Sequence, residues 1–295
     1  MATSKVSNTG HGLAQAVPTV LRGAARQARI ELRIQLFSPM VLSWLAFPII
    51  GLVVLYFLRD QEVMGTAISL AQIGVPGMLA MTLISSGVLG VAGQLVTERD
   101  DGTLLRAKAT PHGVLSHLLG NVLIFTGTAL GPVLALLLAA AFVFDGITPA
   151  DAGGWFTFAW VSVLGLLATL PLGALIGAVL RGPVMLAWAS LIVYGAMAIS
   201  GIFYPIGALP GWLQGIGQAS PIYWLGLGLR ASLLPPEAVA LELGGSWHLW
   251  ETAAVLGAWS VLGLVLAPVA LRRMARRQSG SQVAAARDRV IAQGY

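Results

Sequence analysis

The sequence predicts an all-α integral membrane protein with six transmembrane helices, and three observations lead to this fold class. Hydrophobic residues make up 57% of the 295-residue chain and charged residues only 10%, whereas a soluble domain carries roughly 25% charged residues. The mean hydropathy is +0.82. Uncharged runs that exceed the roughly 20 residues needed to cross a bilayer recur along the chain. We therefore expect one polytopic unit without a second soluble domain.

The composition also narrows the possible chemistry. The chain has no cysteine, which excludes disulfides, thiolate metal sites and cysteine nucleophiles. The spacing of His112 and His117 does not match the i, i+3 or i, i+4 spacing of helical metal ligands, so no metal site is expected. The excess of basic residues is sorted by membrane side, which indicates topology and not a nucleic-acid partner.

The N-terminal region divides into two parts. Residues 1–17 are small and polar, and we expect a disordered cytoplasmic tail. Residues 18–36 carry arginines on one helical stripe, and these are Arg22, Arg26, Arg29 and Arg33. This pattern predicts an amphipathic helix on the anionic inner leaflet. The alternative is a solvated helix that packs on the protein's own loops.

Six uncharged runs predict the spans of a transmembrane domain over residues 37–271. The runs cover residues 34–58, 63–97, 109–144, 152–180, 182–229 and 252–271. The fifth run is long enough for two helices, and the positive-inside rule decides how often it crosses. With one crossing, all of the 17 lysines and arginines except Arg59 and Arg230 lie on the side of the N-terminus. We therefore expect six spans, both termini in the cytoplasm, and a basic cytoplasmic tail over residues 272–295.

The second half of the fifth run must then enter and leave the membrane on one face, so residues 205–232 predict a re-entrant helical hairpin. Pro205, Pro210 and Pro221 break a continuous helix. Trp212 and Tyr223 are suited to the outer headgroup level. Broken backbone at membrane depth is tolerated only where protein or a wet cavity surrounds it. Two short helices dipping from the outer face, over residues 210–218 and 221–229, satisfy that limit.

Residues 98–111 form the densest charge cluster between two apolar runs. Each charge at mid-bilayer costs on the order of 2.5 to 3.5 kcal/mol, so this segment lies in water or against a protein. The candidate contact residues are Glu98, Arg99, Asp100, Asp101, Gly102, Thr103, Leu104 and Leu105. Gly102 permits a turn, Thr103 can cap a helix beginning at Leu104, and the charges can fix the register of an interface. The alternative is a solvated turn between spans.

Two segments resemble the permease subunits of type 2 ABC exporters, particularly the drug-export branch that includes daunorubicin-resistance permeases. The first is Glu98-Arg99-Asp100-Asp101-Gly102-Thr103, which is similar to the family's Glu-Arg-x-x-Gly-Thr loop after the second span. The second is similar to the family's segment after the fifth span, and it comprises Ser200-Gly201-Ile202-Phe203-Tyr204-Pro205, Leu209-Pro210-Gly211-Trp212-Leu213 and Ser220-Pro221-Ile222-Tyr223.

The resemblance implies a half-transporter that pairs with a second permease, itself or a homologue, and with two copies of an ATP-binding subunit in the bacterial plasma (inner) membrane. Residues 98–111 would be the coupling helix, and the arginine-rich helix the connecting helix that also touches the ATPase. ATP and Mg would bind the partner subunit, since this chain has no Gly-x-x-x-x-Gly-Lys-[Ser/Thr] phosphate loop and needs no cofactor of its own.

The expected activity is export of an amphiphilic cargo, drug or lipid-like, and hence drug efflux and antibiotic resistance. No charged residue lies inside a predicted span, so an ion-coupled relay has no residues to use. Small residues in the second and fifth runs, such as Gly87, Gly93 and Gly195, suit either a dimer seam or ordinary helix packing.

Two other function classes stay open at this stage. One is a non-transporting membrane anchor or regulatory subunit of an ATPase complex, which would share the same topology. The other is an intramembrane lipid-modifying enzyme, but the sequence contains no Gly-x-Ser-x-Gly and no His-Glu-x-x-His. No catalytic residue is therefore assigned.

Overall fold

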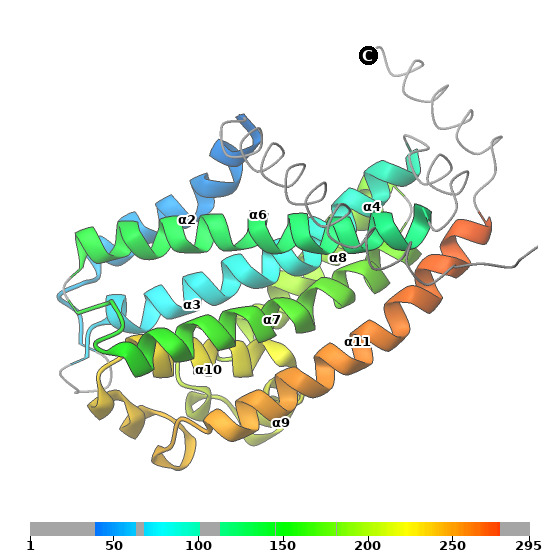
Figure 1. Cartoon of the computed structure of the whole chain (residues 1–295). Coiled ribbons are helices and arrows are strands. Elements are labelled where there is room, and N and C mark those ends of the chain that lie inside the picture. Colours follow the sequence, from blue (N-terminus) through cyan, green and yellow to red (C-terminus); the bar gives the residue numbers. More distant parts are fainter. Residues whose placement is uncertain (1–38, 63–67, 101–112, 145, 181, 278–295) are drawn as a thin grey trace, which may run out of the picture.

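A computed structural model describes residues 39–62, 68–100, 113–144, 146–180 and 182–277 (Figure 1). Within these ranges the protein is helical and forms no strand beyond an isolated bridge between Glu62 and Ser69. Several predicted features lie outside the described residues, namely the tail 1–17, the arginine-rich helix 18–36 with Arg22, Arg26, Arg29 and Arg33, residues 101–112, and the end of the basic tail from residue 278.

Each of the six uncharged runs contains a helix. They are α2 (Pro39–Phe57), the consecutive α3 (Leu70–Ile84), π-helical η1 (Ser85–Gly90) and α4 (Val91–Asp100), α6 (Gly113–Val143), α7 (Ala152–Val179), α8 (Gly182–Ala198) and α11 (Leu249–Arg277). Three helical stretches are long and apolar enough to cross a membrane, over Leu70–Arg99, Ala152–Val179 and Leu249–Met274. The protein is thus a helical membrane protein, and the total of six crossings stays a prediction.

The second half of the fifth run is broken into short helices. They are α9 (Gly211–Ala219) and α10 (Pro221–Leu233), preceded by the 3-10 turn η2 (Ile206–Ala208) and followed by the 3-10 turns η3 (Pro236–Leu241) and η4 (Leu243–Gly245). These helices lie over the two stretches that the prolines predict, although α10 extends past residue 229. Their depth in a membrane stays a prediction.

Local sequence signals set several helix starts. Ser69 and Gln72 form a reciprocal capping box at α3, with N···O distances of 3.2 and 3.0 Å. Asp151 caps α7 by accepting a hydrogen bond from the Gly154 amide at 2.7 Å. At α10, Ser220 accepts from the Ile222 amide, and Pro221 occupies the first turn.

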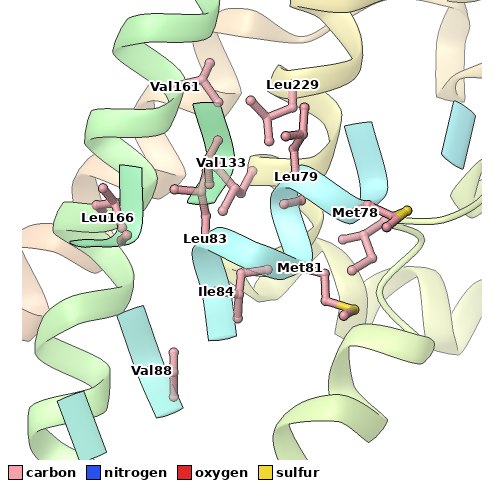
Figure 2. Packing of buried hydrophobic residues seen from close by; sticks show 14 of the residues in the cluster. Met78, Leu79, Met81, Leu83, Ile84, Val88, Val133, Val161, Leu166 and Leu229 are labelled. Atoms are coloured by element: carbon pink, nitrogen blue, oxygen red, sulfur yellow. The ribbon is translucent and has the colours of Figure 1, made fainter. Parts of the chain in front are cut away.

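Helices α3 and α7 form the centre of the bundle, with α6, α10 and α11 around them (Figure 1). Figure 2 shows Leu79 and Leu83 of α3 among Val133 of α6, Leu166 of α7 and Leu229 of α10, all fully or almost fully buried. By contrast, α8 and the outer face of α11 expose large apolar side chains. In a membrane protein such faces contact lipid or another subunit.

Candidate functional site

The last turn of α4 leads directly into the predicted coupling segment. Glu98 is buried, and one of its carboxylate oxygens accepts a hydrogen bond from Gln94 Nε2 at 3.1 Å. Arg99 is partly buried. The backbone of Asp100 ends α4, whereas Asp101, Gly102, Thr103, Leu104 and Leu105 lie outside the described residues. The coupling role of the segment therefore stays a prediction.

Arg99 reaches across to the C-terminal end of α7. Its Nη2 donates to the carbonyls of Gly177 at 3.2 Å and Ala178 at 2.9 Å, and its Nη1 donates to the carbonyl of Leu180. The last carbonyls of a helix have no partner within the helix and form the negative end of its dipole. A guanidinium placed there satisfies these acceptors and carries the complementary charge. Arg99 thus caps α7 from a different helix.

Next to this cap, the backbone of α7 closely approaches the backbone of the consecutive helices α3, η1 and α4, which together we call the α3–α4 rod. A Cβ atom built on Gly173 would lie 2.5 Å from the carbonyl oxygen of Gly87, and one on Gly177 would lie 2.9 Å from Cα of Ala92. Gly173 and Gly177 are four residues apart and share a face, as in the small-xxx-small pattern of membrane helices. The sequence interpretation considered small residues of the second and fifth runs and missed this face of the fourth.

The start of α8 lies next to the contact between Arg99 and the end of α7. Leu180, whose carbonyl Arg99 binds, is separated from Gly182 by one residue. Gly182 has φ of 77°, a backbone conformation that favours glycine, and α8 begins there. Of the described elements, α4 is the one on which α8 packs most. The end of α4, the end of α7 and the start of α8 therefore form one corner of the bundle, next to the last described residue before the coupling segment, Asp100.

The second predicted motif forms a turn after α8. Ser200 Oγ donates to the Met197 carbonyl at 2.7 Å, and Gly201 follows with φ of 73°. Pro205 and Pro210 stand at the N-caps of η2 and α9, and Pro221 begins α10. Trp212 is exposed, whereas Tyr223 is fully buried against the Trp224 ring, because α10 packs inward on α3 and α7. The headgroup-level position of both rings stays a prediction.

A buried ion pair holds this turn. Nε of Arg230 in α10 donates to Oε1 of Glu242 at 2.6 Å, and Nη2 donates to Oε2 at 3.3 Å. Nη1 donates to the carbonyls of Gly201 at 3.0 Å and Ile202 at 3.2 Å. One guanidinium therefore joins three segments, namely α10, the η3–η4 loop and the turn after α8.

Sequence reasoning placed Arg230 on the outer side without a partner and did not single out Glu242. The signal was weak, since it consists of one arginine directly after an apolar run and the second of two glutamates, Glu237 and Glu242, that follow Pro235 and Pro236. Within the part of the chain that the structure describes, no three histidine or carboxylate side chains come together in a way that could hold a metal ion.

The comparisons with known proteins agree with this architecture. Residues 60–269 match the model of a family described as ABC-2 family transporter protein. The matched range contains both sequence motifs, the α4–α7–α8 corner and the Arg230–Glu242 pair. A search of curated proteins found no match.

Proposed function

Because this chain belongs to the ABC-2 family of transporter proteins and is a membrane permease subunit, we propose that it exports an amphiphilic cargo, drug or lipid-like, with energy from a separate ATP-binding subunit. The observation that carries the proposal is the family match, which spans most of the chain and includes the charged segment 98–111 and the broken segment after α8. Membership of this family implies an ATP-binding partner.

The proposed mechanism uses both sequence motifs. Closure of two ATP-binding subunits pushes on residues 98–111 and on the arginine-rich helix, and the helices shift between inward-open and outward-open arrangements. Cargo enters from the cytoplasm or the inner leaflet and leaves near α9 and α10. The sorted basic residues favour an orientation with both termini in the cytoplasm, and the resemblance to drug-export permeases favours the bacterial inner membrane.

The proposed assembly contains a second permease, either a copy of this chain or a homologue. The exposure of α8 supports this part of the proposal, since Val184, Trp188, Leu191 and Ile192 are all more than half exposed. Among the described residues, nothing outside the backbone of α8 lies within 4 Å of a Cβ built on Gly195. Small residues beside a bare apolar face allow close approach of another helix.

The test begins with co-purification in mild detergent. The variant replaces Asp100, Asp101 and Leu104 with alanine, and leaves Glu98 unchanged because that side chain is buried within α4. The matched control replaces Asp60, Glu237 and Leu249, which are exposed. We expect wild type and control to recover a protein with ATPase activity and the variant to lose it.

The second stage places the complex in vesicles with daunorubicin, a fluorescent amphiphile, as the probe. ATP-dependent movement of the probe supports export. ATP turnover without movement of this probe or of a fluorescent phospholipid supports the anchor or regulatory class instead. If the wild type recovers no ATPase in any of several mild detergents, the proposed function is wrong.

A further inference from the structure

We propose that Arg99 is a positioning residue that transmits movement of the coupling segment to the α7–α8 corner inside this chain, and does not bind the ATPase itself. The proposal rests on the proposed function, because it concerns how an ATP-driven displacement enters the bundle. Its starting point is the geometry at the end of α4, where the guanidinium binds three carbonyls of one helix end.

Close packing joins α7 to the η1–α4 stretch. Gly173 and Gly177 of α7 lie against Gly87 and Ala92, and such contact resists approach of the two helices. Van der Waals contact does not single out one partner atom, whereas hydrogen bonds are directional and weaken steeply when the angle or distance changes. Arg99 therefore adds a directional link between the end of α4 and the end of α7.

A displacement at Arg99 has two routes into the bundle. The carbonyl of Leu180 lies at the turn from which α8 departs, and Gly182 gives that turn its left-handed conformation. A pull on Leu180 therefore changes the direction of α8. Helix α7 itself packs most extensively on α11 and α10. A movement that enters at Arg99 thus reaches α8 through the turn and reaches α10 and α11 through packing.

The side chain at position 99 can be varied in geometry and in charge. The arginine fork reaches the three carbonyls from two nitrogens held in one plane, whereas a lysine ammonium presents its three donors from a single atom. The same charge on lysine would keep the favourable interaction with the helix dipole. Arg99→Lys and Arg99→Gln therefore separate geometry from charge.

The experiment measures coupling without knowledge of the cargo. The chain has no cysteine, so spin labels can be attached to single cysteines placed at Val184 near the start of α8 and at Val265 of α11, both exposed. The complex with its ATPase is measured before and after trapping with ATP and vanadate. Wild type, Arg99→Gln, Arg99→Lys and the control Arg272→Gln are compared, since Arg272 is an exposed arginine of α11.

We expect the wild type and Arg272→Gln to change the α8–α11 distance on trapping. In Arg99→Gln the ATPase should still co-purify and turn over, while the fraction of complexes that change their α8–α11 distance on trapping falls about fivefold or more. Arg99→Lys should be intermediate. A purely structural role would lower the yield of folded complex and leave the distance change of the remaining complex unaltered.

Four outcomes overturn the inference. An Arg99→Gln complex whose α8–α11 distance changes on trapping as in the wild type contradicts the inference and leaves the proposed function intact. Loss of the ATPase from Arg99→Gln complexes would show that Arg99 contacts the motor. A wild type that binds no ATPase, or does not respond to trapping, contradicts the proposed function as well. If Arg99→Gln does not fold, a fully responsive Arg99→Lys contradicts the inference.

Discussion

Arg230 of α10 and Glu242 of the following loop form an ion pair with almost no solvent access, with side-chain exposures of 1% and 2%. The contact is bidentate, and the remaining donors of Arg230 reach the turn after α8. Charged hydrogen bonds of this forked kind are the strong ones in proteins. The pair therefore fixes the segment that the proposed mechanism assigns to cargo exit.

Breaking this pair should destabilise the protein strongly. Glu242→Gln leaves a buried guanidinium without its counter-charge, and removal of one partner from such a pair costs about 3–5 kcal/mol. Heating followed by fluorescence-detected size exclusion should show a clearly lower melting temperature. The control is Asp60→Asn, whose pair with Arg59 is exposed and contributes about 0–1 kcal/mol. Equal melting temperatures for the two variants would contradict the importance of the buried pair.

Two glycine substitutions should have opposite effects. Gly173→Ala places a methyl group 2.5 Å from a backbone carbonyl of the α3–α4 rod, and overpacking of this kind costs about 1–3 kcal/mol. Gly195→Ala meets no atom within 4 Å and lowers the entropy of the unfolded chain, so it should stabilise α8 by about 0.5–1 kcal/mol. Melting temperatures of the two variants check both signs. A stabilising Gly173→Ala would refute the close approach of α7.

Cysteine cross-linking should identify the permease dimer. Ile192 on α8 and Val265 on α11 are both strongly exposed, at 70% and 62%. We expect Ile192→Cys to form a covalent dimer on mild oxidation in membranes, because α8 packs little on its own chain and carries the small residues of the predicted seam. Val265→Cys, on the helix that packs widely on α7, serves as the comparison. If Val265→Cys cross-links and Ile192→Cys does not, the dimer contact lies at α11 and not at α8.

The contribution of the turn before α11 to the stability of the protein should depend on pH. His248 has Nε2 at 3.0 Å from the Leu243 carbonyl and Nδ1 at 3.2 Å from Glu251 Oε1. Both neighbours are acceptors, so the protonated ring satisfies both, and the hydrogen bond to Leu243, followed by that to Glu251, raises the pKa of His248 above its usual value of 6.5.

A raised pKa in the folded state means that the contribution of His248 to stability is fully present below pH 6.5 and is lost as the pH rises through the raised pKa. His248→Gln should therefore melt below wild type at pH 5.5 and converge with it near pH 8. Because the site is largely exposed, we expect a small difference. A difference in melting temperature between wild type and His248→Gln that widens as the pH rises would contradict the raised pKa of His248.

The sequence predicted most of the helical architecture from local signals. Apolar runs, positive charge on one side, and the breaks at Pro205, Pro210 and Pro221 depend on composition and on neighbours along the chain. For the same reason it predicted short helices where α9 and α10 lie. The Glu98–Arg99 motif and the segment after α8 could also be found, since each is contiguous in sequence.

Local sequence patterns and the resemblance they carry therefore predict a helical membrane permease with its charged and broken segments in order. The partners of those segments follow from the packing of the helices. Arg99 and Leu180 are 81 residues apart, and Arg230 is 29 residues from the Gly201 carbonyl. Pattern along a chain specifies which face of a helix is apolar, but the pairing of a charge with a distant carbonyl depends on how helices pack in space.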